Sequence, residues 1–210
     1  MLRGVAAGRN LGDNLLSRCT YSRVEDFAIL QSALEDTFID GVSDEEELDT
    51  TRQCMSSVGI DDHIQQQLFQ LLFGVLHMGN VSFEEDVDGS VNGVSAATSL
   101  CFQSCCDLLG IAESDMLAAL CKRNMHVGGS VIVKSQSLEQ AVDKKSSLAK
   151  SIYSILFTWL VDQINSTIKP ATAHWGTSTV RHCADVMKVI LLMGVYRIYW
   201  SPRYLWLREL

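Results

Sequence analysis

The 210-residue chain is poor in positive charge, because 17 lysine and arginine residues stand against 25 aspartate and glutamate residues. The formal net charge is −8. Nucleic-acid-binding domains carry a basic face, so we expect no nucleic-acid partner. Long hydrophobic runs are missing as well, since no uncharged apolar run reaches the roughly 20 residues that a membrane-spanning helix needs. We therefore expect no membrane span.

The motifs of common catalytic sites are also missing. The sequence contains neither the phosphate-binding patterns GxxxxGK[ST] and GxGxxG nor the patterns GxSxG and HExxH. His77 stands alone on a mostly apolar helix, while His174, His182 and Cys183 have irregular spacing and no fourth ligand for zinc. We predict no catalytic residue, no cofactor-binding residue and no metal ligand in this chain, and we interpret His77 as a packed residue.

The seven cysteines form no CxxC pair and no regular framework. The disulfide pattern of small secreted proteins is therefore not expected. Cys101, Cys105 and Cys106 lie in one helical-looking run, where a small apolar residue suits a buried position. The first residues lack the apolar core of a signal peptide. These features predict a reduced, cytoplasmic environment.

The longest periodic stretch runs from Ser137 to Pro170 and predicts one long amphipathic helix. Ser137 and Gln140 have the spacing of a capping box, and Pro170, one of only two prolines, supplies a stop. Steps of three and four residues predict that one face is buried. That face comprises Leu148, Ile152, Ile155, Leu156, Trp159, Leu160, Ile164 and Ile168.

Several shorter helices are predicted before it. We expect helices over residues 22–38, from a capping box at Ser43, over 61–80, over 96–110 and from Ser114 to Leu120. The helix over 22–38 is predicted to bury Val24, Phe27, Leu30 and Leu34, and the helix over 61–80 to bury Ile64, Leu68, Leu71, Leu72, Val75 and Leu76. Gly79 and Asn80 are expected to close the latter by left-handed geometry. Residues 81–83 are strand-like, and 84–94 is predicted to be an acidic surface loop. The acids at 44–49 lack the alternating ligands of a calcium loop and suit a helix start.

Residues 122–134 differ in character, because they are basic, alternate in polarity and contain the turn Gly128-Gly129. This pattern predicts a two-stranded β-hairpin. A basic hairpin in an acidic protein is either a solvated hairpin or a docking site for an acidic partner. The candidate binding residues are Lys122, Arg123, Asn124, Met125, His126, Val127 and Lys134.

Four segments together resemble a known family. They are GVSDEEELDTTRQCMSSVGI at 41–60, LFQLLFGVLHMGNVSF at 68–83, LLGI at 108–111 and SLAKSIYSILFTWLVDQINSTIKP at 147–170. Their order and spacing resemble a myosin motor domain over residues 20–170. The resemblance implies a mainly α fold around the long helix with a small β-hairpin, forming part of the upper jaw of the actin-binding cleft. It also implies that the hairpin touches the actin filament and that the acidic loop at 84–94 lies near it.

The complete family domain binds ATP and Mg²⁺ and is cytoskeletal. This chain lacks the family's phosphate loop and its Asn- and Ser-rich switch, and beyond Pro170 it lacks the expected Asp-Ile-x-Gly-Phe-Glu switch. We expect residues 1–19 to be a poorly specified start and 171–210 to be an irregular tail unrelated to the family. Phosphoryl transfer depends on the missing parts, so we expect no ATP hydrolysis by this chain.

Three hypotheses follow. The chain is an incomplete piece of an actin-based, ATP-driven motor, which would pair with the remainder of a motor domain. Alternatively, it is a standalone actin- or partner-binding helical module without motor activity. In the third, the Trp-rich tail is a membrane-surface or partner-binding segment.

Overall fold

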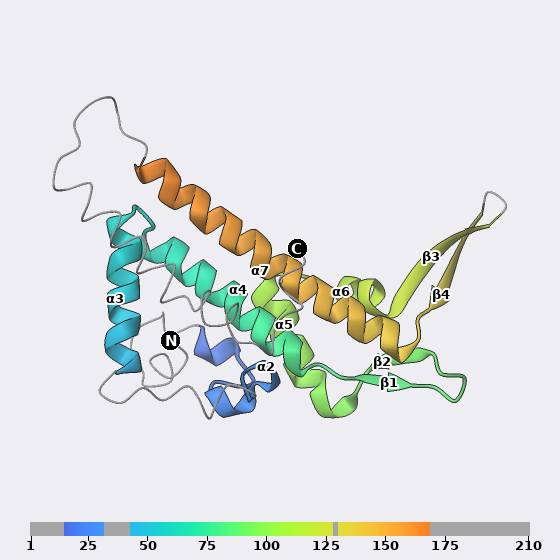
Figure 1. The fold of residues 1–210 in the computed structure, drawn as a ribbon. Coiled ribbons are helices and arrows are strands. Elements are labelled where there is room, and N and C mark those ends of the chain that lie inside the picture. Colours follow the sequence, from blue (N-terminus) through green and yellow to red (C-terminus); the bar gives the residue numbers. More distant parts are fainter. Residues whose placement is uncertain (1–14, 32–42, 128–129, 169–210) are drawn as a thin grey trace. The chain divides into compact units, whose positions relative to one another are not determined.

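A computed structural model describes residues 15–31, 43–127 and 130–168, which are mainly helical (Figure 1). Within these residues the chain divides into two compact units. The smaller unit holds residues 43–66 and 157–168, and the larger holds 15–31, 67–127 and 130–156. The predicted tail, Pro170, His174, His182 and Cys183 lie outside the described residues. Among the described helices, none is both long and apolar enough to cross a membrane.

The elements follow the chain in a simple order. They are η1 (Leu16–Arg18), η2 (Val24–Asp26), α2 (Ala28–Gln31), α3 (Asp44–Ser57), α4 (Asp62–Asn80), β1 (Phe83–Glu85), β2 (Val91–Val94), η3 (Ala96–Thr98), α5 (Ser99–Leu109), α6 (Glu113–Cys121), β3 (Lys122–Val127), β4 (Ser130–Ser135) and α7 (Leu138–Ile168). β1 pairs with β2, and β3 with β4, each in an antiparallel two-stranded sheet. The predicted mainly α fold with a hairpin is confirmed.

The predicted cap of α7 is confirmed. Gln140 N–H donates to Ser137 Oγ at 3.3 Å, and Ser137 N–H donates to Gln140 Oε1 at 3.4 Å. Ser43 likewise caps α3, accepting from Glu46 N–H at 3.5 Å, with acidic residues filling the first turn. Asp61 Oδ1 accepts from Ile64 N–H at 2.9 Å and starts α4. Each of these oxygens satisfies an amide that has no partner within its helix.

The buried face of α7 differs from the predicted one at Ile155, which is 68% exposed. Ala141, Leu160 and Ile164 are buried. Leu160 and Ile164 continue the half-buried positions 148, 152 and 156 at steps of four residues. Each step of four turns about 40° around the helix beyond one full turn. The buried stripe therefore rotates around α7 as the helix proceeds, and Ile155 falls behind it.

The buried face of α4 also differs from the predicted one. Of the six residues expected inside, only Leu68 is fully buried, while Gln65, Phe69, Phe73 and His77 are 0% exposed. These four lie at successive steps of four residues along the helix. The predicted face included aliphatic residues only. The prediction therefore left out the aromatic and polar side chains that are most deeply buried.

The prediction that Gly79 closes α4 by left-handed geometry is wrong, because Gly79 does not have a positive φ. Its role is close packing, because a Cβ at this position would clash with the side chain of Ile29. Lys145, half-buried on α7, satisfies the end of α4 by donating to Gly79 O at 3.2 Å and Val81 O at 2.7 Å. Burial lowers the pKa of Lys145.

Other predicted boundaries were wrong. The segment expected as one helix from residue 22 is the turn η2 and the short α2, separated by the extended Phe27. Asn80 holds this break, because its side chain accepts from Ala28 N–H at 2.8 Å and donates to Asp26 O at 2.6 Å. Val24 and Phe27 are buried as predicted; Leu34 lies outside the described residues.

The predicted acidic loop at 84–94 is in part a strand, since β2 pairs with β1. Its acidic turn is therefore shorter than expected. Within the turn and β2, Asp88 Oδ1 accepts from Ser90, and Asp86 Oδ1 accepts from Asn92. α6 begins at Glu113 after Ala112, so Ser114 is not its cap. The Ser114 hydroxyl instead faces Asp115 Oδ1 at 3.5 Å.

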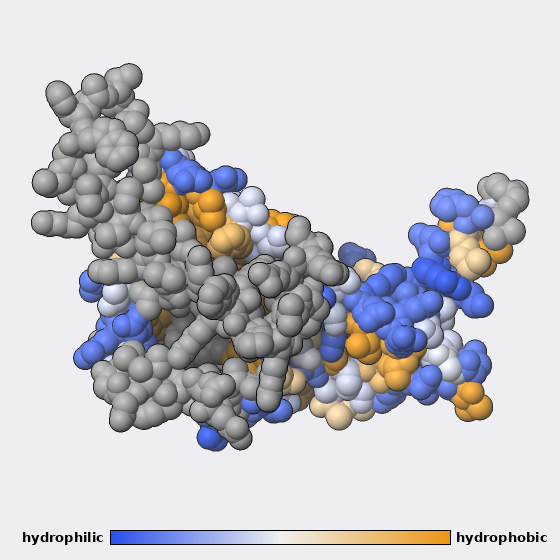
Figure 2. All heavy atoms as spheres, viewed as in Figure 1, coloured by the Kyte–Doolittle hydropathy of each residue, from blue (hydrophilic) through white to orange (hydrophobic). Residues whose placement is uncertain are grey.

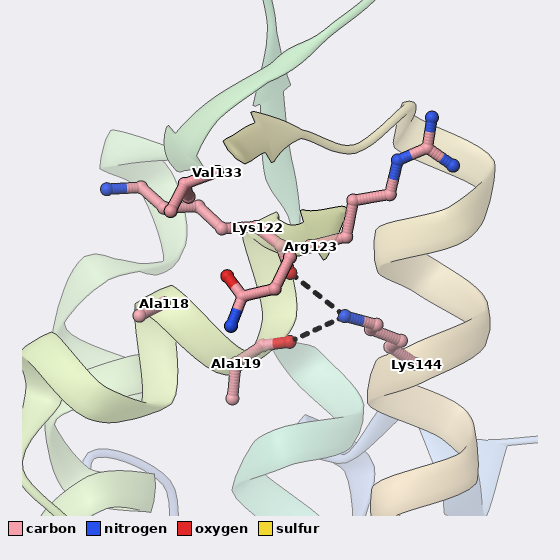
Figure 3. Close-up of a pocket in the computed structure, with 7 residues that line it drawn as sticks. Ala118, Ala119, Lys122, Arg123, Val133 and Lys144 are labelled. Atoms are coloured by element: carbon pink, nitrogen blue, oxygen red, sulfur yellow. Dashed lines mark hydrogen bonds between the residues drawn. The ribbon is translucent and has the colours of Figure 1, made fainter. Parts of the chain in front are cut away.

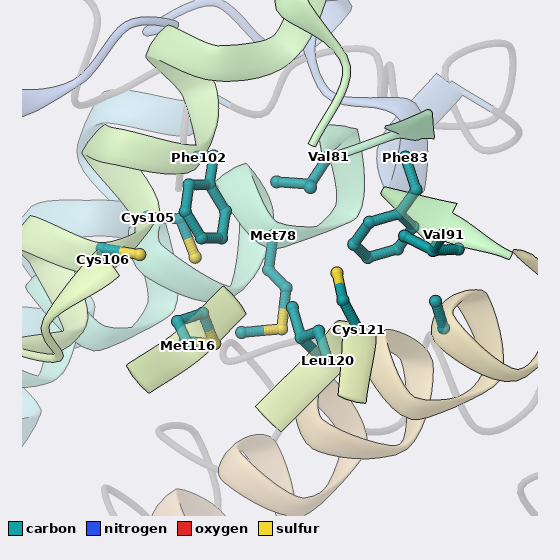
Figure 4. Packing of buried hydrophobic residues seen from close by; sticks show 11 residues of the cluster. Met78, Val81, Phe83, Val91, Phe102, Cys105, Cys106, Met116, Leu120 and Cys121 are labelled. Atoms are coloured by element: carbon teal, nitrogen blue, oxygen red, sulfur yellow. The ribbon is translucent and has the colours of Figure 1, made fainter. Parts of the chain in front are cut away.

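One apolar cluster forms the core of the larger unit (Figure 4). It contains Met78, Val81, Phe83, Val91, Phe102, Cys105, Cys106, Met116, Leu120, Cys121 and Ala141. The helices α4 to α7 and the first hairpin all contribute to it. The expected burial of Cys101, Cys105 and Cys106 is confirmed, because each is at most 2% exposed. This core supports the C-terminal end of α6, where the second hairpin begins.

Candidate functional site

The β3–β4 hairpin contains all seven candidate binding residues. Its register pairs Lys122 with Ser135, Arg123 with Lys134, Asn124 with Val133, Met125 with Ile132, His126 with Val131 and Val127 with Ser130. Successive side chains of a strand point to opposite faces. The structure therefore divides the candidates, with Lys122, Asn124 and His126 on one face and Arg123, Met125 and Lys134 on the other. Val127 sits at the last pair before the turn.

The hairpin is exposed on both faces. Met125 is 38% exposed, and Val131, Ile132 and Val133 are 52–60% exposed. Figure 1 shows the two strands leaving the ends of α6 and α7 as a ribbon, and Figure 2 shows hydrophobic and hydrophilic residues interspersed along it. Apolar residues on an uncovered two-stranded ribbon are unusual for a surface that binds nothing. Both faces of this ribbon are therefore open to solvent.

The basic groups of the hairpin form no ion pair within the described residues. The ion pairs there join Arg18 to Asp107, Arg23 to Glu25 and Arg52 to Asp62, none of which lies on the hairpin. Arg123 and Lys134 instead stand directly opposite each other. Like charges in such a pair destabilise a sheet. An external acidic group would relieve that repulsion.

Lys134 has one weak electrostatic neighbour in the first hairpin. The pKa of Asp88 is lowered mainly by hydrogen bonds from Ser90, and Lys134 adds a smaller electrostatic contribution. Both groups are exposed to solvent, which screens their attraction. The turn of the first hairpin therefore places a negative charge near Lys134 of β4.

Gln136 fixes the root of the hairpin, and the sequence prediction missed it. It is 4% exposed, and its Nε2 donates to Leu120 O at 2.9 Å and Lys122 O at 3.0 Å. Its backbone N–H donates to Cys121 O, and its carbonyl accepts from Val91 N–H at 2.8 Å. A polar residue directly before the capping box at Ser137 was the available signal. The hydrogen bonds of Gln136 therefore hold the base of the exposed ribbon in place.

His77 is buried and neutral, as the packed-residue interpretation predicted. Its Nδ1 lies 2.8 Å from Phe73 O, and its Nε2 accepts from Tyr21 N–H at 3.2 Å. Nε2 must therefore be unprotonated, which leaves the proton on Nδ1. The imidazole stacks on Tyr21 and meets the edge of Phe27. Burial lowers the pKa of His77.

The thiols of α5 are also parts of the core. In the part of the chain that the structure describes, no three His, Cys, Asp or Glu residues gather where a metal ion could bind. Burial raises the pKa of Cys101 to about 11 and that of Cys105 to about 12. A thiol with such a pKa is almost fully protonated at neutral pH and is a poor nucleophile.

Comparison with known proteins agrees with the sequence resemblance. The family model of the myosin head (motor domain) matches residues 9–180. Human unconventional myosin-Vb is 34% identical over 133 residues, which are 63% of this chain and 7% of that protein. Myosin-1 of Arabidopsis thaliana is 36% identical over 140 residues, covering 67% of this chain and 12% of the relative. Myosin-2B of Naumovozyma castellii is 32% identical over 158 residues, covering 75% and 11%.

Fold and surface define a mainly helical unit that presents a basic β-ribbon from a rigid base. The chain belongs to the myosin motor domain family. It spans about a tenth of the length of the curated relatives that it matches. Myosins are cytoskeletal motors, and ATP and actin binding are properties of the family.

Proposed function

We propose that this chain is a piece of an actin-based, ATP-driven motor and that its β3–β4 hairpin contacts the actin filament in the cytoplasm. The observation that carries the proposal is the exposed ribbon itself. Lys122, Arg123 and Lys134 have no ion pair in the described residues, and apolar residues alternate with them. Family membership supplies the partner, since the filament is the common track of myosins.

The mixture of charge and apolar surface suits this partner. Positive groups steer the approach to an acidic surface and set the register. Met125 and Ile132, paired across the strands, provide apolar area that loses water on contact. Gln136 and Lys144 hold the root of the ribbon, the latter through the two hydrogen bonds dashed in Figure 3, so this root does not have to become ordered on binding. A pre-organised surface binds more tightly for the same area.

Co-sedimentation of the purified chain with actin filaments tests the proposal. We expect saturable binding at low salt that weakens several-fold between about 50 and 300 mM salt, because the charges involved are exposed. The double variant Lys122→Glu plus Arg123→Glu should reduce binding at least about tenfold. Wild-type chain that stays in the supernatant at low salt would reject the hairpin as a filament contact.

We also propose that the chain alone neither binds nor hydrolyses ATP, because its sequence contains no phosphate loop. A fluorescent ATP analogue with Mg²⁺ should show no saturable binding at micromolar concentrations. The ATP and Mg²⁺ site of the whole motor would then come from the remainder of a motor domain. Saturable micromolar binding by the purified chain would contradict this proposal.

A further inference from the structure

Asn92 and Gly93 form the only asparagine–glycine pair in the sequence, and they lie in β2 of the first hairpin. Glycine has no Cβ, so its backbone nitrogen is open to the side chain of the residue before it. That nitrogen can attack the side-chain amide carbon of the asparagine and expel ammonia. The pair is therefore chemically reactive wherever the backbone around it is free to adjust.

The register of the first hairpin leaves Asn92 without a partner on β1. Glu84 pairs with Gly93, and the next residue, Glu85, pairs with Val91. Asn92 is therefore the extra residue of a β-bulge. A bulge disrupts the ladder locally and leaves its extra residue unpaired. The backbone at this asparagine is consequently less constrained than the backbone of a regular strand.

The pair and the turn before it are open to solvent. Asn92 is exposed, and Val87 in the turn is fully exposed. Figure 1 shows the turn between β1 and β2 pointing away from the helices. A Cβ built on Gly93 would meet no atom within 4 Å. Water therefore reaches the pair, and the space beside Gly93 is open.

Two comparable pairs are protected by their surroundings. Asn165 precedes Ser166 inside α7, where the helix commits each interior amide nitrogen to a hydrogen bond. Asp88 precedes Gly89 in the turn of the first hairpin, and hydrogen bonds from Ser90 lower the pKa of Asp88. Asp88 is thus a carboxylate at neutral pH, and a carboxylate is a poor target for attack by nitrogen. The pair in β2 has neither protection.

We propose that Asn92 is a site of spontaneous deamidation in the folded chain. The Gly93 nitrogen gives up its proton and bonds to Asn92 Cγ, the Cγ–Nδ2 bond breaks, and Nδ2 takes up a proton and leaves as ammonia. Water then opens the succinimide ring at either carbonyl carbon and yields aspartate or isoaspartate. The reaction consumes one water molecule and needs no oxidant. It goes beyond the filament contact, because it concerns the other hairpin and is tested without actin.

Deamidation changes the charge of the first hairpin. In the unmodified chain, Asn92 Nδ2 donates to Asp86 Oδ1 at 3.3 Å. The carboxylate of the product cannot donate this bond, and it places a second negative charge beside Asp86. Each modified chain therefore carries one additional negative charge, and anion-exchange chromatography separates it from the unmodified chain.

Incubation of the full 210-residue chain in mildly alkaline buffer, below its melting temperature, tests the proposal. Peptide mapping by mass spectrometry should find conversion of the amide to the acid at Asn92, increasing with time, with aspartate and isoaspartate both present. Asn165 should react at least about tenfold more slowly, because α7 holds the following nitrogen. Equal rates at the two asparagines would overturn the proposal. So would an Asn92 that reacts in urea but stays unmodified in the folded chain.

Gly93→Ala is the matched control variant. The methyl group fits, because Gly93 does not have a positive φ and the space beside it is open. It also hinders the approach to the adjacent nitrogen, so deamidation at Asn92 should slow at least about fivefold. Circular dichroism melting checks that the variant folds. An unchanged rate in folded Gly93→Ala would contradict attack by the Gly93 nitrogen.

Discussion

At the scale of single residues, the chain shows that polar side chains on apolar helices can be structural parts. His77 is held between Phe73 O and Tyr21 N–H in its neutral form, and Gln65 satisfies the turn between α3 and α4 by donating to Ile60 O at 2.9 Å. Buried polar groups need such partners, because an unpaired one costs about 1–3 kcal/mol. In the sequence alone, such a residue looks the same as a residue that binds a ligand. Only its contacts in the structure distinguish the structural role from the binding role.

The lowered pKa of His77 makes the stability of the fold depend on pH. In the unfolded chain a histidine has a pKa near about 6.5, whereas in the folded chain the pKa of His77 is lower. As the pH falls below about 6.5, the unfolded state gains a proton that the folded state does not take up. The contribution of His77 is therefore present above that pH and is lost as the pH drops toward the folded pKa.

We expect the free energy of unfolding, measured by urea titration, to decrease between about pH 7.5 and 5. His77→Gln should lower stability at pH 7.5 by about 1–3 kcal/mol through the lost packing and hydrogen bonds. The variant should also show a shallower pH dependence than the wild type. Parallel pH curves for the two proteins would show that His77 does not cause the effect.

At the scale of elements, caps were easier to predict than buried faces. The predicted caps at Ser43 and Ser137 depend on a local spacing, and in the structure both serines cap their helices. The buried face of a helix depends on what packs against it, and single-sequence periodicity cannot supply that. The misplaced Ile155 on α7 and the missed Phe69 and Phe73 on α4 both have this origin.

The stripe on α7 can be tested with one pair of matched substitutions. Ile164 is 2% exposed and Ile155 is 68% exposed, although both belonged to the predicted face. Ile164→Ala should cost about 2–5 kcal/mol of unfolding free energy, because it removes a buried side chain and leaves a cavity. Ile155→Ala should change stability by less than about 0.5 kcal/mol. Urea unfolding of both variants compares these values, and equal losses would contradict the rotating stripe.

At the scale of the whole molecule, the family and the main architecture could be predicted from the sequence. Four separate segments indicated the family, while the periodic stretch at 137–170 and the basic hairpin indicated the architecture, because each is a local pattern of residues. The β1–β2 pairing and the packing of residues 15–31 could not be predicted in the same way. The packing of residues 15–31 depends on contacts such as Arg18 Nε to Asp107 Oδ2 at 2.6 Å, which join residues far apart in the chain.

The candidate site was predicted as a set of residues, and the structure adds its internal order. The register places Arg123 opposite Lys134 and Met125 opposite Ile132 on one face, which a list of basic residues does not reveal. It also shows that Gln136 and Lys144 hold the root of the ribbon. These contacts decide which variants are informative, because a change at Gln136 would disturb folding whereas a change at Arg123 alters an exposed group.

The most direct test of the central claim is the affinity of the purified chain for actin filaments, compared between two charge reversals. Arg123→Glu changes the hairpin, and Arg23→Glu changes an exposed arginine of the same unit that lies outside it. We predict that Arg123→Glu weakens binding at least about fivefold, whereas Arg23→Glu changes it less than about twofold. Equal affinities for wild type and both variants would contradict the assignment of the hairpin as the filament contact.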